Sequence, residues 1–366
     1  MTEPSQDIPF RDEPWPLPEC GECRFLPLAP DTEAAWETFL AARDAYPVGY
    51  HPLHLAYQHE YFAGVAARYR RLDSLIVLRG EVVGIWPLAS DGAGNLSSHI
   101  NGAAGIAPPL LAEQLSDKQR KQAVAACLTA LAHLARSDTD ASRPWRFAGV
   151  EASASVDAWQ QALLSRGASS GCRYRLVADL SLDAASYHRQ LRKSYKSLIN
   201  SAEKQWSARI DATGDAAEFA RFAALHEQVA GRKTRSAATW RWQYEAIACR
   251  QAFAVYLRDT AGEVVGASLF NASRDEAYYA VGAYDRRLFD QPVAHLSLHR
   301  AICHARDTGR RRLILGDRPF PGDQPAPNAK ELQIAFFKEG FATDLQILPV
   351  LTLPIAALLS SEPSAR

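Results

Sequence analysis

The sequence has few of the features that would set it apart from ordinary globular proteins. Its 366 residues include 41 basic and 41 acidic side chains, so no net charge attracts DNA over a broad surface. It has no run of about 18 apolar residues, and its acidic, proline-rich N-terminus lacks the apolar core of a secretory signal. We therefore expect a cytoplasmic protein with no transmembrane segment and no DNA partner.

Metal-binding and nucleotide-binding motifs are also scarce. Of six cysteines, only Cys20 and Cys23 are closely spaced, and no second CxxC pair completes a zinc site. No Walker loop, GxxxxGK[ST], is present. We expect reduced thiols and no bound metal.

An internal repeat divides the chain into two halves. Gly80–Gly84 and Gly262–Gly266 have the same sequence, GEVVG, at an offset of 262 − 80 = 182 positions. Apolar runs flank each copy and predict a β-hairpin. In each half a helix precedes the hairpin, and a strand, a helix, a strand, a helix ending near glycine and a last strand follow it. One of these expected strands is His99–Gly102. The pattern predicts an α/β (α+β) fold of two tandem domains, each a mixed, largely antiparallel sheet with flanking helices.

The same pattern sets the expected domain boundaries. A chain of this length is more than one hydrophobic core usually fills, which agrees with two domains. The expected segments are a proline-rich tail over 1–25, a first domain over 26–180, a linker over 181–206, a second domain over 207–355 and a C-terminal tail over 356–366.

The linker is expected to be one long helix with Ser181 or Asp183 near its N-cap. It carries an apolar stripe and, beside it, a basic stripe that includes Arg192, Lys193 and Lys196. The basic stripe is either a solvated face or a site that binds a phosphate or diphosphate.

Four stretches resemble motifs of one known family. They are Lys193–Lys204 in the linker, Leu225–Arg235 followed by Trp240, Ala277–Asp285, and FFKEGF at Phe336–Phe341. Together with the element order, they resemble the Fem-like branch of the GNAT acyltransferase superfamily, in which two GNAT domains occur in tandem. That branch includes bacterial acetyltransferase-like proteins and aminoacyltransferases, and the resemblance covers about residues 26–355.

The resemblance implies where an acyl donor binds. In GNAT domains the central strands splay apart beside a helix N-terminus, which receives the donor's pyrophosphate. The corresponding loop here, 286–294, has no glycine and so departs from the usual coenzyme A loop. Arg286 and Arg287 in this loop are the basic residues expected to bind phosphate, together with the basic residues of the linker.

The resemblance also implies catalytic roles. Lys338, in the FFKEGF stretch, is expected to stabilise the oxyanion that forms when an amine attacks the acyl carbonyl, and Phe337 is expected to stack on the donor. Asp317 follows an expected strand and is a candidate general base. The expected substrate cleft contains Glu227, Arg232, Arg235, Tyr279 and Asp285.

The resemblance implies an N-acyltransferase. It would move an acyl group from acyl-CoA, with acetyl-CoA the expected donor, to an amine of a sugar, an amino acid or a cell-envelope or secondary-metabolite precursor. Attack would be direct, without a covalent enzyme intermediate. One alternative is an aminoacyltransferase that takes aminoacyl-tRNA as donor. An alternative of another class is a non-catalytic binding protein that retains the fold.

Overall fold

The computed structural model describes residues 16–66, 68–91, 94–102, 104–136, 140, 143–149 and 156–360. The first half contains strands β1 to β9, helices α1 to α4 and the 3-10 helices η1 and η2. Their bounds are β1 Cys23–Pro27, α1 Glu33–Ala41, η1 Val48–Tyr50, α2 Pro52–Ala63, β2 Arg70–Arg71, β3 Ser74–Leu78, β4 Glu81–Trp86, β5 Ala89–Ser90, β6 Leu96–Ser97, η2 Ile100–Gly102, β7 Leu110–Leu111, α3 Asp117–Ala135, β8 Pro144–Ala148, α4 Ala158–Leu164 and β9 Ser169–Asp179.

The second half continues the alternation of helices and strands. Its elements are α5 Ala184–Gln190, α6 Lys193–Gln205, β10 Ser207–Asp211, α7 Ala216–Ala230, α8 Ala237–Ala248, β11 Ala252–Arg258, β12 Val264–Ala272, β13 Glu276–Tyr284, η3 Arg286–Leu288, α9 Val293–Asp307, β14 Arg312–Asp317, α10 Ala329–Glu339, β15 Asp344–Pro354 and α11 Ile355–Leu359. The mixed, largely antiparallel α/β fold predicted from the sequence is confirmed.

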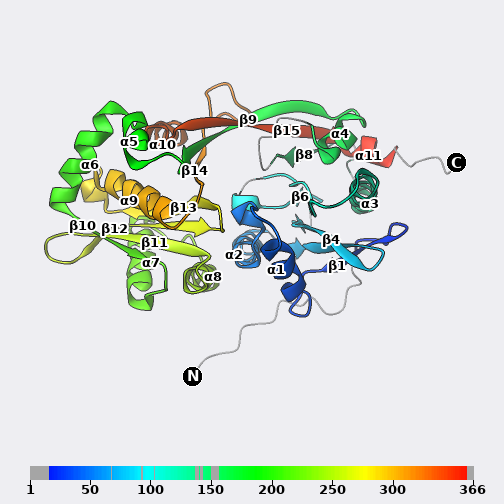
Figure 1. Ribbon diagram of the computed structural model, residues 1–366, viewed down its shortest axis with the longest axis horizontal. Coiled ribbons are helices and arrows are strands. Elements are labelled where there is room, and N and C mark those ends of the chain that lie inside the picture. The colour runs from blue at the N-terminus through cyan, green and yellow to red at the C-terminus, as the bar shows by residue number, and fades with distance from the viewer. Residues whose placement is uncertain are drawn as a thin grey trace.

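The two halves share strands. The largest sheet has the order β10-β11-β12-β13-β14-β9-β15-β8, so β9 of the first half lies between β14 and β15 of the second. The far end of β15 pairs with β8, which belongs to the first half. Figure 1 shows β9 and β15 running side by side from one half of the molecule to the other. The division at residue 180 stays a prediction, but the sheet is continuous across it.

Both repeated GEVVG stretches form hairpins, as predicted. In the first, Arg79 and Gly80 make the turn between β3 and β4 with φ of 54° and 88°, a left-handed pair that suits a two-residue turn. In the second, Gly262 has φ of 83° in a longer turn between β11 and β12. The strand expected at 99–102 is wrong, because Ile100–Gly102 forms η2, with Asn101 left-handed at φ 53°.

The linker is not one helix, which corrects the sequence prediction. Asp183 caps α5, as expected, by accepting a hydrogen bond from the backbone N–H of Ser186. The helix then stops, because Leu191 and Arg192 have ψ of 142° and 130° and the N–H of Arg192 donates to the carbonyl of Gly340. A bond to the end of α10 therefore replaces the helical bond, and α6 starts in a new direction.

Helices cover both faces of the second-half sheet. On one face, residues of α6 and α9 form a core with β11 to β14 that includes Tyr195, Leu296 and Phe341. On the other face, α7 and α8 form a second core that includes Phe222 and Ile247. The N-terminal half has two comparable cores, one under α3 and α4 and one under α1 and α2.

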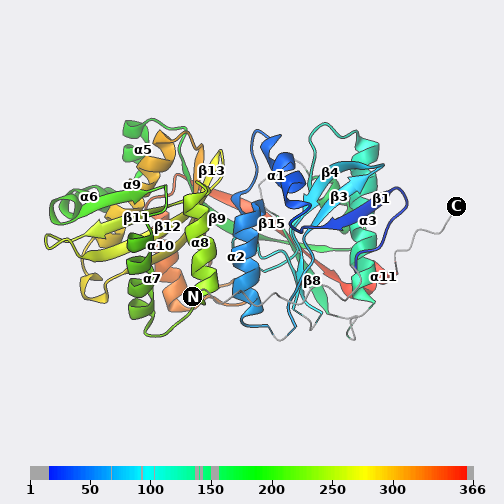
Figure 2. The ribbon, with the colours of Figure 1, turned by 90° about the horizontal axis from the view of Figure 1, so that it is seen from below.

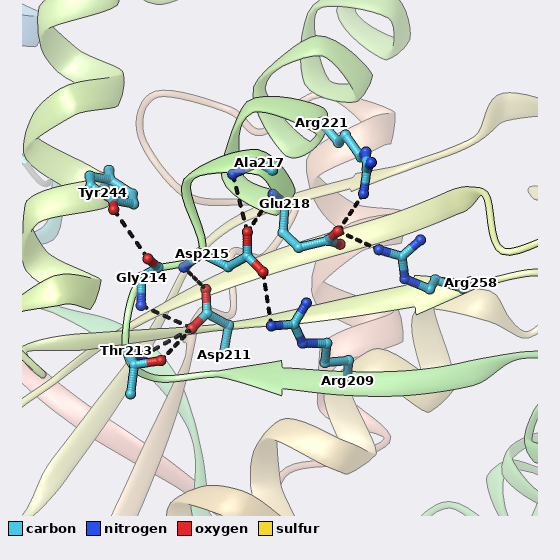
Figure 3. Close-up of polar contacts among 10 residues, drawn as sticks. All are labelled: Arg209, Asp211, Thr213, Gly214, Asp215, Ala217, Glu218, Arg221, Tyr244 and Arg258. Atoms are coloured by element: carbon cyan, nitrogen blue, oxygen red, sulfur yellow. Dashed lines mark hydrogen bonds and ion pairs between the residues drawn. The ribbon is translucent and has the colours of Figure 1, made fainter.

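The start of α7 is fixed to the sheet by a polar cluster, drawn in Figure 3. Asp211, at the end of β10, accepts hydrogen bonds from the backbone N–H groups of Thr213, Gly214 and Asp215. Asp215 then caps α7, and the buried Glu218 accepts from both Arg221 and Arg258. The cluster joins a helix of the second half to two of its strands.

The two halves meet along a polar seam. The buried carboxylate of Glu276 on β13 accepts from the N–H of Val48 in the first half at 3.0 Å and from Arg312 at 2.8 Å. The Tyr278 hydroxyl donates to the carbonyl of Asn101 at 3.3 Å. Helices α2 and α8 lie side by side across the seam, as Figure 2 shows. These contacts join the halves independently of the shared strands.

Candidate active site

Strands β13 and β14 separate in the middle of the large sheet. They pair in parallel only over Glu276–Tyr278 and Arg312–Ile314, although β13 continues for six residues beyond Tyr278. Register irregularities occur on both outer sides of this point, in β12–β13 and in β14–β9. Beyond this segment, the described residues of the two strands do not pair with each other. We call this opening the strand gap, and it is the splay that the resemblance predicts.

Lys338 lies at the strand gap. It belongs to the last turn of α10, and a Cβ placed on Gly316 of β14 would lie 2.9 Å from its Nζ. Gly316 has φ of 126°, so a glycine is needed there both for the backbone and for the room it leaves. Burial lowers the pKa of Lys338 to about 8. No carboxylate among the described residues forms an ion pair with it.

Tyr279 forms the opposite wall of the Lys338 site. The Lys338 Nζ lies 4.7 Å from the centre of the Tyr279 ring, which is a cation–π contact. The Tyr279 hydroxyl lies 3.3 Å from that of Tyr284, and burial raises the pKa of both phenols. A Cβ on Gly282 would lie 2.1 Å from the Tyr279 hydroxyl, so this glycine also makes room for the tyrosine. The fold thus brings together Lys338 and Tyr279, which are both expected site residues.

The helix that follows β13 presents an anion-binding end. Helix α9 begins at Val293 after Pro292, and no side chain caps its first turn. Free N–H groups and the helix dipole favour an anion there. Arg286 in the preceding loop is exposed, whereas Arg287 is bound to Asp285, which accepts from both its side chain and its backbone N–H. Asp285 therefore stabilises the turn η3. It also pairs with Arg287, one of the two arginines of this loop that were expected to bind phosphate.

The basic end of the linker packs against the FFKEGF stretch. The Arg192 guanidinium carbon lies 3.9 Å from the centre of the Phe336 ring, and one of its nitrogens donates to the Tyr195 hydroxyl at 2.9 Å. Phe337 is half-buried among Tyr195, His295 and Phe341. Its ring is thus part of the core, and Phe336, 58% exposed, is the aromatic available for stacking.

Lys193 and Lys196 lie beyond this junction on α6, with Lys193 exposed and Lys196 half-buried. Neither makes an ion pair with a described carboxylate. Their role in phosphate binding stays a prediction.

Asp317 has an arginine partner that the sequence analysis missed. Its carboxylate forms an ion pair with Arg173 of β9, which leaves it poorly placed to collect a proton as general base. Arg146 of β8 and Arg175 of β9 lie on the same sheet face as Arg173. The residues of β15 opposite Arg173, Arg175 and Arg146 are Leu348, Gln346 and Thr352, which are an even number of positions apart and so share one face. Burial, and then repulsion from Arg175 and Arg146, lowers the pKa of Arg173. The RxR spacing at 173–175 was the available signal, since alternate residues of a strand share a face.

Of the other expected cleft residues, Arg235 lies at the seam between the two halves. Arg235 donates to the Tyr57 hydroxyl of α2 at 3.1 Å and lies 2.6 Å from Nε2 of His226. It therefore joins α2 to the second half. Glu227 and Arg232 are exposed at the end of α7 and just beyond it. They are not gathered around the strand gap by these contacts.

The described residues contain no cluster of three or more His, Cys, Asp or Glu side chains suited to a metal ion. The described part of the chain also contains no helix that is both long enough and apolar enough to cross a bilayer.

Comparison with known proteins agrees with the geometry. Residues 188–325 match the acetyltransferase (GNAT) domain family. The match begins in α5 and ends before α10, so it covers the strand gap but not Lys338. A comparison with curated proteins finds no similar sequence.

Solved structures show the same fold over nearly the whole chain. FemX is 12% identical, with a TM-score of 0.59, 89% of this chain covered and 96% of that chain. The structure of L-PGS from Bacillus licheniformis is 12% identical, with a TM-score of 0.59 and coverages of 90% and 95%. The C-terminal domain of a putative lysylphosphatidylglycerol synthetase from Agrobacterium fabrum is 10% identical, with a TM-score of 0.59 and coverages of 90% and 94%. At these identities the likeness concerns the fold.

Proposed function

Because the chain is an acyltransferase with a GNAT domain in a Fem-like fold, we propose that it transfers an acyl group from acyl-CoA to the amine of a small acceptor. The observation that carries this proposal is the half-buried Lys338 ammonium at the strand gap, which forms no ion pair with a described carboxylate. A partly desolvated cation is stabilised when negative charge develops beside it. An acyl carbonyl held in the gap would develop that charge when it is attacked.

The reaction follows from the groups at the gap. The neutral acceptor amine attacks the thioester carbonyl carbon, a C–N bond forms, and the carbonyl oxygen takes the negative charge beside Lys338. The C–S bond then breaks, the coenzyme A thiolate leaves and takes up a proton, and the amine nitrogen loses one to a base or to solvent. The uncapped start of α9, with Arg286, is suited to the donor's pyrophosphate.

An aminoacyl-tRNA donor is the second candidate. The η3 turn stands where a glycine-rich phosphate loop would be, and Arg287 is paired with Asp285. Fewer groups are therefore available to bind the phosphates of coenzyme A. Exposed Lys193 and the neighbouring Lys196 offer charge for a nucleic acid backbone on α6 instead. A non-catalytic binding protein is the third alternative, and the open strand gap that retains Lys338 argues against it.

Mass spectrometry of acylated products tests the proposal. The purified protein is incubated with an amine library and either acetyl-CoA or charged tRNA, and Lys338→Ala is run beside wild type. An oxyanion-stabilising cation acts in the transition state, so Lys338→Ala should lower kcat by about 10²–10³ with a much smaller effect on donor binding. Melting temperature should hardly change. Turnover at the wild-type rate in Lys338→Ala would refute the role of the lysine, and product with charged tRNA alone would select the second candidate.

A further inference from the structure

A second pocket lies between the two halves, at a distance from the strand gap. It has a volume of about 570 Å³, and the first half contributes Glu37, Tyr46 and His51 to its wall. The second half contributes Arg250, Arg274 and Arg310, from turns before β11, after β12 and after α9. We call it the seam pocket. Helix α9 has 15 residues, so its two ends lie about 22 Å apart, and the seam pocket is near the end opposite to the proposed donor site.

The charges of the seam pocket are unbalanced. Three arginine residues line it, and Glu37 is the one acidic residue among its described lining residues. None of the three arginines forms an ion pair with a described carboxylate. Arg274 donates to the backbone carbonyls of Arg43 and Ala41, at 3.2 and 3.4 Å, which leaves its charge uncompensated.

Arg310 is the most buried of the three cations. Its Nη1 donates to the Thr308 hydroxyl at 2.6 Å, but its Nε is buried and has no hydrogen-bond partner among the described residues. Leaving a buried donor of a charged group unsatisfied is unfavourable. An anion in the pocket would supply an acceptor for guanidinium donors and would neutralise charge.

His51 adds another donor to the pocket wall. It is 7% exposed, and its Nδ1 accepts a hydrogen bond from the backbone N–H of Leu53 at 3.3 Å. The neutral ring must then carry its proton on Nε2. No described residue accepts a hydrogen bond from that Nε2–H. The histidine thus presents a donor rather than an acceptor to a ligand.

We propose that the seam pocket binds a small phosphorylated anion, held by the guanidinium groups of Arg250, Arg274 and Arg310. Guanidinium groups bind phosphate oxygens in a bidentate geometry, and several around one pocket favour a phosphate over a monovalent ion. The volume of about 570 Å³ exceeds that of inorganic phosphate, so the pocket has room for a phosphate monoester or diphosphate with an organic part. Because both halves line the pocket, the bound anion joins them and stabilises the fold by mass action.

Isothermal titration calorimetry with inorganic pyrophosphate and with adenosine 5′-monophosphate tests this site. Wild type should bind at least one of them, and Arg274→Gln and Arg310→Gln should each weaken binding about tenfold, the effect of losing one charge-assisted contact. Arg274 is exposed, so Arg274→Gln should keep its fold even if Arg310→Gln does not. Arg241→Gln is the matched control, because Arg241 is an exposed arginine of α8 outside the pocket, and it should bind as wild type does.

The donor site must be separated from the seam pocket in the same experiment. Titrations are repeated with saturating coenzyme A and with Arg286→Gln, and neither should change the affinity at the seam pocket. The proposal fails if wild type binds neither probe, if Arg274→Gln and Arg310→Gln bind as tightly as Arg241→Gln, or if coenzyme A removes the binding. None of these outcomes depends on whether the chain transfers acyl groups.

Discussion

The proposed acyl transfer depends on how one side chain, that of Lys338, is held. Burial lowers its pKa to about 8, so at neutral pH it remains mostly protonated but close to titration. As pH rises through about 8, Lys338 loses its proton and its positive charge. If the ammonium stabilises the oxyanion, kcat should therefore fall above pH 8, whereas a lysine acting as general base would make kcat rise there.

A pH profile of kcat with Lys338→Arg distinguishes these roles. Arginine stays protonated throughout this range, so the falling limb near pH 8 should disappear in Lys338→Arg, although its planar group restores only part of the rate. Tyr279 keeps the opposite wall of the site in both proteins. A falling limb that persists in Lys338→Arg would assign it to another group and would contradict the oxyanion role.

Burial also determines how much the charged side chain of Glu218 contributes to stability. Its side chain is 4% exposed and accepts from Arg258 and Arg221, at the point where α7 meets the sheet. Removing the Glu218 carboxylate leaves the half-buried Arg258 without its counter-ion. Glu218→Ala should therefore lower the free energy of unfolding by about 3 kcal/mol. Glu245→Ala, which breaks the exposed pair with Arg241, should cost about 0.5 kcal/mol or less. Urea denaturation of both variants measures the difference, and equal losses would contradict the role of burial.

At the scale of elements, the junction of α6 and α10 contains one very close contact, which involves Gly340. Gly340 ends α10, and a Cβ there would lie 2.2 Å from the Tyr195 ring, whose hydroxyl donates to the Phe337 carbonyl. Gly340→Ala should force α6 and α10 apart, lower stability by about 1–3 kcal/mol and reduce turnover, because α10 carries Lys338. Gly322→Ala is the control, since nothing lies within 4 Å of a Cβ there. Thermal denaturation that finds the two variants alike would show that the junction is not tight.

The elements differ in how far the sequence determines them. The hairpins were predictable because GEVVG supplies a turn glycine between apolar runs, and that signal is local. The break at Leu191–Arg192 was not, because its cause is a hydrogen bond to Gly340, almost 150 positions away. Helices α2 and α8 were not identified as a pair, since only the folded chain shows that they pack together.

The candidate site divides in the same way. Lys338 and Tyr279 were predicted as site residues because they lie in stretches of sequence that resemble family motifs. The pairing of Asp317 with Arg173 was missed because it depends on β9 lying beside β14, which no local pattern indicates. Phe337 was preferred over Phe336 as a donor contact because a sequence motif does not show which of two adjacent rings turns into the core.

For the molecule as a whole, strand sharing makes the second half dependent on the end of the first. Strand β9 separates β14 from β15, so a fragment over 207–355 would leave β15 with no partner inside its own sheet. It would also lose α6, which covers one face of the core. We expect this fragment to be largely unfolded, whereas a fragment over 169–360 retains β9, α5 and α6 and should unfold cooperatively. Circular dichroism during thermal denaturation compares the two. If 207–355 melts as sharply as 169–360, the expected second domain is an independent folding unit and the shared strand contributes little to its stability.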